Sequence, residues 1–243
     1  MPWFYAVVER KHELQNPTSP EKIRLLGERL RLGPESRILD IASGRGGPAI
    51  LLAATFGCRI TCVEASEEFH AAALARVREA GLEELIGSVH ADARTFRLEP
   101  SDYDAALCLG ASFVWGGLEG TLEALVPVVR PGGFVAVGEP YWRTWPLPEG
   151  FEPDEGESFV TLSETVERFR GAGLAPVTMI NASRDDWDRY ETLHWLAGEE
   201  WLHEHPGDPD ADEIRARIER HRDRYLRWER DLLGWAIVAG RKR

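Results

Sequence analysis

The fold of this chain is decided by the segment Arg37-Ile38-Leu39-Asp40-Ile41-Ala42-Ser43-Gly44-Arg45-Gly46-Gly47. A short apolar run ends near an acidic residue, enters a turn of small residues, and leaves into the apolar segment 49–54. This pattern predicts a strand, a tight turn and a helix. Glycine permits positive φ and close approach of a ligand, and the free N–H groups of a helix start point into such a turn. We therefore expect a nucleotide-like cofactor at this turn.

The composition limits the class of protein. The chain has 243 residues, of which 43% are apolar and 29% charged, which is typical of one large globular domain. A formal net charge of -12 argues against a duplex nucleic-acid binder. The cysteines, Cys58, Cys62 and Cys108, lie in apolar runs, so we expect buried, reduced thiols. No apolar stretch is long enough to span a bilayer and the N-terminus has no secretory pattern, which predicts a soluble cytoplasmic protein.

Strands and helices alternate on both sides of the opening turn. We expect strands at 37–41, 59–64, 86–90, 103–109, 134–138, 174–182 and 232–239. Expected helices follow Thr18 and occupy 47–56, 66–80, 118–129, 163–171, 183–205 and 212–231, whereas 139–156 is expected to be a loop. Strands that are apolar throughout and alternate with helices predict a mostly parallel sheet covered on both faces.

Four of the predicted strands end in distinctive chemistry. Asp40 closes the first, and Glu64 closes the second, where a carboxylate can accept hydrogen bonds from both ribose hydroxyls. Asp92 follows the third, where it can accept from the exocyclic amine of adenine, and Gly110 follows the fourth as a small residue. Ligands of open parallel sheets bind beyond the carboxyl ends of the strands. These residues therefore predict one cofactor site.

A nicotinamide-dependent oxidoreductase is the nearest competitor. Its G-x-G-x-x-G pattern would place the third glycine at Ala49, which is a weaker match. Asp40 would repel a pyrophosphate but suits a cofactor that carries an ammonium and a sulfonium. The acidic residue before the turn therefore favours S-adenosylmethionine.

The motifs around this turn resemble those of the class I S-adenosylmethionine-dependent methyltransferases over about residues 35–140. They are the segments 39–47, 63–66, 90–93 and 130–133, and Ala42 stands where the first glycine of the D-x-G-x-G-x-G loop is usual. The resemblance implies a Rossmann-like, doubly wound α/β sheet of seven strands, with the last strand antiparallel between the fifth and sixth. It implies these cofactor-binding residues: Asp40, Ala42, Ser43, Gly44, Gly46, Glu64, Ala65, Asp92, Ala93 and Gly110.

Four further segments resemble a little-characterised bacterial branch that acts on small molecules. They are 15–17 (Gln-Asn-Pro), 109–112, 138–143 and 187–191. This resemblance covers nearly the whole chain but supplies no substrate.

The loops after strands four and five supply candidates for the acceptor side. Glu139 is the best-placed general base and Tyr141 is a second catalytic candidate, although solvation or helix capping would equally explain the acid. Arg143 suits an acceptor carboxylate or phosphate, or a surface salt bridge. Trp115 and Trp142 complete this set as substrate contacts.

One face of the helix at 183–205 is aromatic. Trp187, Tyr190, His194, Ala197 and Trp201 recur at helical spacing, and we favour core packing for the set as a whole. Tyr190 and His194 also carry polar groups, which makes them candidate substrate contacts. An aromatic cage for a cationic acceptor stays open at this point.

We expect a single domain with four parts. A helical arm or lid occupies 1–33, the cofactor-binding core 34–182, a helical insertion on the substrate side 183–231, and the last strand 232–243. The group Trp3–Tyr5 would cover the cofactor or mediate dimer contacts. We expect no metal, no membrane or nucleic-acid partner, and a monomer or homodimer.

The expected reaction is methyl transfer to a small molecule by direct displacement, with S-adenosylhomocysteine as product. The alternatives are a cofactor-binding regulatory protein of the same fold and, third, the nicotinamide-dependent oxidoreductase.

Overall fold

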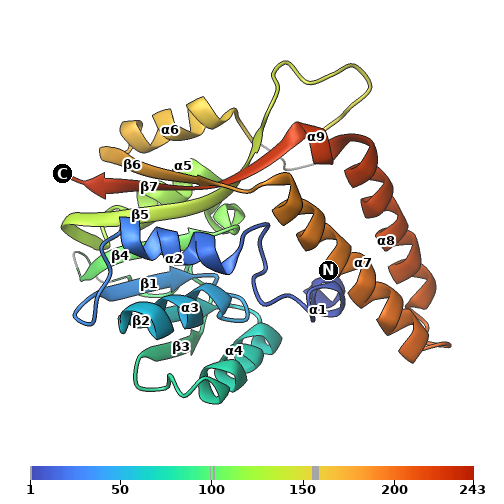
Figure 1. Cartoon of the computed structure of the whole chain (residues 1–243), viewed down its shortest axis with the longest axis horizontal. Coiled ribbons are helices and arrows are strands. Elements are labelled where there is room, and N and C mark those ends of the chain that lie inside the picture. Colours follow the sequence, from blue (N-terminus) through green and yellow to red (C-terminus); the bar gives the residue numbers. More distant parts are fainter. Residues whose placement is uncertain (1, 99, 101, 155–158) are drawn as a thin grey trace.

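One sheet of seven strands forms the centre of the computed structural model, which describes residues 2–98, 100, 102–154 and 159–243 (Figure 1). The strands are β1 (Arg37–Ile41), β2 (Arg59–Glu64), β3 (Ile86–His90), β4 (Tyr103–Leu109), β5 (Val129–Trp142), β6 (Leu174–Asn181) and β7 (Leu233–Lys242). Their order is β3-β2-β1-β4-β5-β7-β6, and β7 is antiparallel to both of its neighbours. The predicted topology, with the last strand between the fifth and sixth, is confirmed.

Helices cover both faces of the sheet. They are α1 (Pro2–Val8), α2 (Pro20–Arg29), α3 (Gly47–Phe56), α4 (Glu67–Glu79), α5 (Leu118–Leu125), α6 (Leu162–Gly171), α7 (Arg184–Glu204), α8 (Ala211–Arg224) and α9 (Arg230–Leu232), with a 3₁₀ turn η1 (Ser112–Trp115) and a π-helical turn η2 (Tyr225–Glu229). Leu26 of α2 and Leu52 of α3 belong to the core on one face. Leu122 of α5 and Phe169 of α6 belong to the core on the other.

Side-chain caps fix where several helices begin. Ser19 accepts from the Lys22 N–H at the start of α2, and Ser66 accepts from the Phe69 N–H at the start of α4. Capping boxes start α6 at Thr161 and α7 at Ser183, and they give hydrogen-bond acceptors to N–H groups in the first turn of each helix. These caps place α7 directly after β6.

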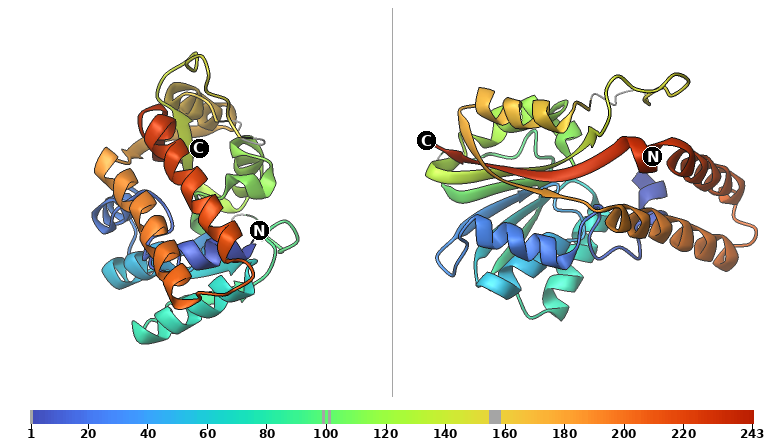
Figure 2. Two further views of the ribbon diagram at one scale, coloured as in Figure 1. Left: turned by 90° about the vertical axis from the view of Figure 1, so that its right-hand side faces the viewer. Right: turned by 45° about the horizontal axis from the view of Figure 1, so that its top comes forward.

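The long helices α7 and α8 extend past the carboxyl ends of the strands, and α1 lies against them (Figure 2). Phe4 and Val8 of α1 form a small core with Leu202, Ile214 and Ile218. This is the predicted helical insertion before the last strand. No helix in the described residues is long and apolar enough to cross a membrane.

Three predicted boundaries are wrong. β5 continues to Trp142, although 139–156 was expected to be a loop, because beyond Gly138 it pairs with β7 alone and an edge tolerates Pro140. α5 ends at Leu125 rather than 129: Val126 still has helical φ and ψ and donates to the Leu122 carbonyl, but Pro127 has no N–H group with which to continue the helix. The helix expected at 212–231 is divided by η2. The three cysteines are buried and unpaired, as predicted.

Candidate functional site

The turn between β1 and α3 has an unusual backbone. Ala42, Gly44 and Gly46 all have positive φ, at 51°, 55° and 74°. Ala42 thus adopts the left-handed conformation that glycine adopts more easily, at the position where the resemblance expects glycine. A Cβ on Gly44 would lie 2.2 Å from Gln15 Oε1, so the turn has no room for a side chain there.

Glu64 ties the turn after β1 to the turn after β2. Its carboxylate is buried and accepts from the N–H of Gly44 and the N–H of Ser66, each at 2.8 Å. Each oxygen keeps a lone pair free for a further donor. The predicted role of Glu64, to accept from a ribose diol, is compatible with this geometry.

Asp40 is a buried carboxylate that lacks a full set of partners. Its Oδ2 atom and the Oγ atom of the neighbouring Ser43 have no hydrogen-bond partner. Burial, and then the charge on Glu64, raise the pKa of Asp40 to about 7. A cation beside Asp40 would offset this cost of ionisation, so the residues present fit the ammonium and sulfonium of S-adenosylmethionine.

The segment 13–17 closes over these turns. Gln15 Oε1 accepts from the Arg45 N–H at 2.6 Å, and Asn16 Nδ2 donates to the Leu109 carbonyl at 2.9 Å. Gly110 has φ of 88°, and a Cβ there would lie 2.0 Å from Asn16 Oδ1. Glycine suits both positions because Gly44 and Gly110 have positive φ and the side chains of Gln15 and Asn16 pack directly on them.

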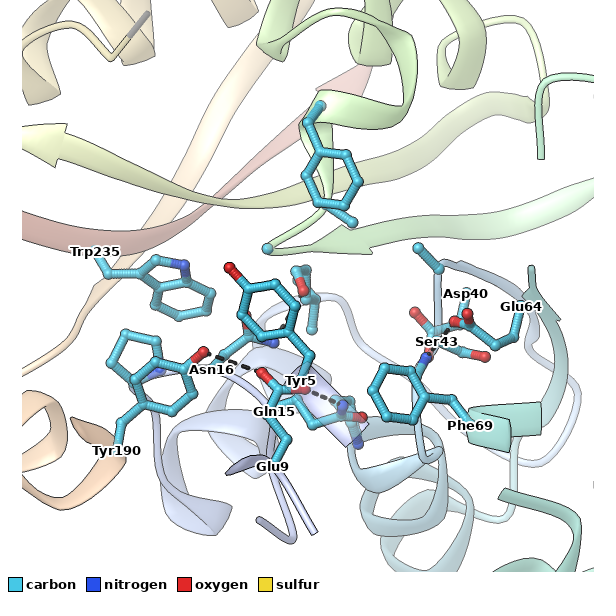
Figure 3. A pocket seen from close by; sticks show the side chains of 18 of the residues that line it. Tyr5, Glu9, Gln15, Asn16, Asp40, Ser43, Glu64, Phe69, Tyr190 and Trp235 are labelled. Atoms are coloured by element: carbon cyan, nitrogen blue, oxygen red, sulfur yellow. Dashed lines mark hydrogen bonds between the residues drawn. The ribbon is translucent and has the colours of Figure 1, made fainter. Parts of the chain in front are cut away.

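Together these residues border a cavity of about 400 Å³ at the carboxyl ends of β1, β2 and β4 (Figure 3). Its lining comprises Tyr5, Glu9, Gln15, Asn16, Pro17, Asp40, Ala42, Ser43, Gly44, Pro48, Glu64, Ser66, Phe69, Leu109, Gly110, Ala111, Phe113, Pro140, Trp187, Tyr190 and Trp235. Asp40, Ser43, Glu64 and Phe69 lie at one end. We call this the cofactor end.

The part of the cavity away from these residues has Tyr190 and Trp235 at its far end, with Trp187 next to Tyr190 and with Tyr5 and Glu9 nearer the middle, and we call these five residues the acceptor end. Figure 3 shows four of these side chains, all except Trp187, labelled beside Gln15 and Asn16. They come from α1 and the segment after it, from α7, and from β7. The predicted substrate contact Tyr190 is among them.

Several predicted cofactor residues lie outside the lining. Asp92 is paired with Arg94, and the hydrogen bonds from Arg94 lower the pKa of Asp92 to about 2. The Ala65 carbonyl accepts from His90 Nε2, while Gly46 caps α3 and Ala93 is buried in the core. The roles of Asp92, Ala65, Gly46 and Ala93 towards the cofactor stay predictions.

The two predicted catalytic residues also lie outside the lining. Side chains alternate along β5, so Pro140 borders the cavity while Glu139 and Tyr141 point to the other face of the sheet. Burial raises the pKa of Glu139 to about 7, although the Ser112 side chain lowers it, and the Oε2 atom has no partner. A catalytic role for either residue stays an untested prediction.

The remaining acceptor-side candidates have structural contacts. Trp142 is buried and packs on Phe151, with ring centroids 5.6 Å apart. Arg143 Nε donates to the Leu233 carbonyl at 2.8 Å, and Trp115 is half-buried against the core beneath α5. None of these three side chains lines the cavity, so their substrate roles are also untested.

The aromatic face of α7 is divided between two tasks. Trp187 and Tyr190 line the cavity, whereas Ala197 is fully buried in the packing of α7. His194 lies behind Tyr190, with Nε2 3.7 Å from Glu9 Oε1 and Nδ1 3.9 Å from Glu191 Oε2. Burial lowers its pKa, but contacts with Glu191 and Glu9 raise it more, to about 9. His194 therefore supports the wall of the cavity as a cation.

Sequence reasoning missed Glu9, Phe69, Phe113 and Trp235. None of them belongs to a recognisable motif, and the expected lid role of Trp3–Tyr5 was the signal that the N-terminal region reaches the site. Tyr5 was part of the expected lid. The side chain of Trp3, the other aromatic residue of that group, lies outside the described part of the chain.

Comparisons with known proteins agree with this geometry. A family model described as a methyltransferase domain matches residues 38–133. The crystal structure of a SAM-dependent methyltransferase from Geobacter sulfurreducens in complex with S-adenosyl-L-homocysteine is 35% identical, with a TM-score of 0.92, and the match covers 100% of this chain and 99% of that one.

Two curated relatives extend the comparison. The uncharacterized protein YjhP of Escherichia coli (strain K12) is 35% identical over 98% of both chains. The 27-O-demethylrifamycin SV methyltransferase of Amycolatopsis mediterranei (strain S699) is 27% identical over 77% of this chain and 69% of its own length. With full-length similarity, the fold and a cofactor turn suited to a sulfonium, this chain belongs to the class I S-adenosylmethionine-dependent methyltransferases.

Proposed function

We propose that this methyltransferase acts on a small organic molecule by direct displacement. The observation that carries the proposal is the single cavity of about 400 Å³, in which the cofactor end and the acceptor end are continuous. A concave site lined mostly by apolar and aromatic side chains with a few polar groups is typical of small-molecule sites. The similarity to an enzyme named for 27-O-demethylrifamycin SV also supports a small acceptor.

The cofactor supplies a methyl group activated on a positively charged sulfur. Asp40 and Glu64 would hold the cofactor through its cationic and hydroxyl groups, and the positive-φ turn would bring backbone N–H groups close to it. Gln15 and Asn16 keep the N-terminal segment over the turns. The rings of Tyr5, Tyr190 and Trp235 would exclude water and align the acceptor, which supplies most of the acceleration that a displacement needs.

The test has a binding arm and a turnover arm. Isothermal titration is run with S-adenosylmethionine, S-adenosylhomocysteine and NADH, and we expect binding of the first two alone. Release of S-adenosylhomocysteine is then measured with panels of small amines, alcohols, phenols, thiols and carboxylic acids, and with bacterial RNA and protein. We expect turnover with at least one small molecule.

Turnover only with RNA or protein would contradict the small-molecule assignment. Cofactor binding with no turnover on any panel would instead favour the regulatory alternative. A cytoplasmic location and a monomeric or homodimeric state, both expected from the sequence, stay predictions, as does movement of residues 1–33 as a lid.

A further inference from the structure

The charge of the cavity lining is one-sided. Among the described residues, three carboxylates line it, namely Glu9, Asp40 and Glu64, and no lysine, arginine or histidine does. Asp40 and Glu64 lie at the cofactor end. Glu9 belongs to the acceptor end and lies beside Tyr190 and Gln15, away from Asp40 and Glu64 (Figure 3). The cofactor accounts for the first two carboxylates but leaves Glu9 unexplained.

The Glu9 carboxylate is held in place by three side chains. Gln15 Nε2 donates to its Oε2 atom at 2.6 Å, and the Tyr190 hydroxyl donates to its Oε1 atom at 3.4 Å. His194 faces the same Oε1 atom at 3.7 Å. Only 7% of Glu9 is exposed, yet the residue still lines the cavity. The contacts therefore fix the carboxylate at the cavity wall.

The groups behind Glu9 leave a negative balance. His194 is a cation shared between Glu9 and Glu191, which gives one positive charge against two negative charges. Burial and then the charge on His194 lower the pKa of the adjacent His12 to about 4, so His12 is neutral. Arg45 donates to the main-chain carbonyls of Glu9 and Arg10, not to the Glu9 carboxylate.

Aromatic rings surround this carboxylate. Tyr5, Trp187, Tyr190 and Trp235 line the same end of the cavity, and the rings of Trp187 and Tyr190 meet edge to face at 6.2 Å. Ring faces attract cations, and a desolvated carboxylate adds a directional partner. An anionic acceptor would find no basic side chain in this lining, and a neutral one would leave the net negative charge of Glu9, Glu191 and His194 unbalanced.

We propose that the acceptor is an amine, which enters the acceptor end as an ammonium held by the Glu9 carboxylate and the rings of Tyr5, Trp187, Tyr190 and Trp235. The inference rests on the proposed function and narrows its substrate class. Glu9 acts here as a binding residue: its carboxylate orients the nitrogen by accepting a hydrogen bond from one of the N–H groups.

The reaction balances with the cofactor as the only co-reactant. The ammonium first loses a proton to solvent, which exposes the nitrogen lone pair. This lone pair forms a bond to the methyl carbon as the carbon–sulfur bond breaks, and the electrons of that bond stay on sulfur. The products are the methylated ammonium and S-adenosylhomocysteine.

The first test compares matched acceptors on the wild-type enzyme. Benzylamine and N-methylbenzylamine are assayed against benzyl alcohol, with methylamine and propylamine as smaller amines, and S-adenosylhomocysteine release is measured. We expect turnover with amines alone. Tetramethylammonium, which has no lone pair to methylate, should inhibit that turnover.

Turnover with the full panel of amines, alcohols, phenols, thiols and carboxylic acids separates failure of the amine assignment from failure of the small-molecule function. Turnover with phenols, thiols or acids but with no amine would overturn the amine assignment and leave the small-molecule function standing. No small-molecule turnover at all would overturn both.

Two variants test the residues. Glu9→Gln should raise KM for the best amine about tenfold or more and change the dissociation constant of S-adenosylhomocysteine less than about twofold, because it removes a charge at the acceptor end only. Glu200→Gln is the matched control: this carboxylate pairs with Lys11 outside the cavity, and KM should be unchanged. Equal weakening of both ligands by Glu9→Gln would place Glu9 at the cofactor and overturn the proposal.

Tyr5 gives a second test that does not depend on Glu9, and its half-exposed side chain allows substitution without loss of the fold. Tyr5→Phe keeps the ring and should leave KM for the amine within about threefold, whereas Tyr5→Leu should raise it about fivefold. If both variants raised KM for the amine equally, the ring would not hold an amine. The same conclusion would follow if Tyr5→Leu, but not Tyr5→Phe, bound S-adenosylhomocysteine more tightly than S-adenosylmethionine.

Discussion

The cofactor end of the cavity is built from turns that directly follow β1, β2 and β4, whereas the acceptor end combines α1, α7 and β7. At the cofactor end, backbone N–H groups and positive-φ residues do much of the work, as the contacts of Glu64 with Gly44 and Ser66 illustrate. At the acceptor end, side chains from α1 and the segment after it, from α7 and from β7 form the cavity wall. We therefore expect single substitutions to weaken ligand binding strongly at the cofactor end and less at the acceptor end.

Asp40→Asn should have the largest effect and act in opposite directions on binding and stability. Loss of the carboxylate should weaken S-adenosylmethionine binding about 100-fold, or about 3 kcal/mol, by removing the anion opposite its cationic groups. The free energy of unfolding of the ligand-free protein should rise by about 1–2 kcal/mol at pH 8. Isothermal titration and denaturant unfolding measure the two effects.

The effect of Asp40→Asn on the free energy of unfolding should depend on pH. Since the pKa of Asp40 is raised to about 7, the cost of ionising it in the fold is absent below pH 4, grows towards pH 7 and is complete above it. The stability gain of Asp40→Asn should therefore be larger at pH 8 than at pH 5. Asp102→Asn, which changes an exposed partner of Arg37, is the control and should alter neither quantity. If Asp40→Asn left the cofactor affinity unchanged, the expected difference between the cofactor end and the acceptor end would be wrong.

Glu64→Ala should follow, with cofactor affinity weakened by about 1–3 kcal/mol. The substitution leaves the Gly44 and Ser66 N–H groups without their acceptor and removes the partner proposed for the ribose hydroxyls. Isothermal titration measures the affinity, and Glu79→Ala, at an exposed site on α4, serves as control. Unchanged affinity would remove Glu64 from the ribose role.

Glu139→Gln should have the smallest effect on activity, since the side chain lies on the opposite face of the sheet from the cavity. We expect kcat within about threefold of the wild type and a gain of about 1 kcal/mol in stability at pH 8, and little gain at pH 5, because the raised pKa makes ionisation costly only at the higher pH. Glu123→Gln on the exposed side of α5 is the matched control. A large fall of kcat in Glu139→Gln would support a catalytic role for Glu139 and would indicate that the acceptor binds nearer to β5.

Local signals predicted much of the fold and less of the site. The apolar runs located every strand, but residues 139–142 of β5 were expected to belong to a loop. Whether a strand tolerates a proline such as Pro140 depends on which neighbours the strand has there, and the sequence does not show them. The aromatic spacing on α7 identified Tyr190. It did not separate Tyr190 from His194, since the two lie on one helix face and differ only in what packs against them.

The sequence by itself determined the strands, the alternating helices and the cofactor turn, while the resemblance to the methyltransferases implied the order of the strands. Periodicity and turns depend on neighbours along the chain, and parallel strands necessarily bring their following turns to one edge. Only the tertiary structure decided the acceptor end, because Glu9, Tyr190 and Trp235 meet through packing of α1 against α7 and through insertion of β7 into the sheet. Contacts between distant segments leave no periodic pattern in the sequence, so a buried carboxylate among rings becomes visible only once the chain is folded.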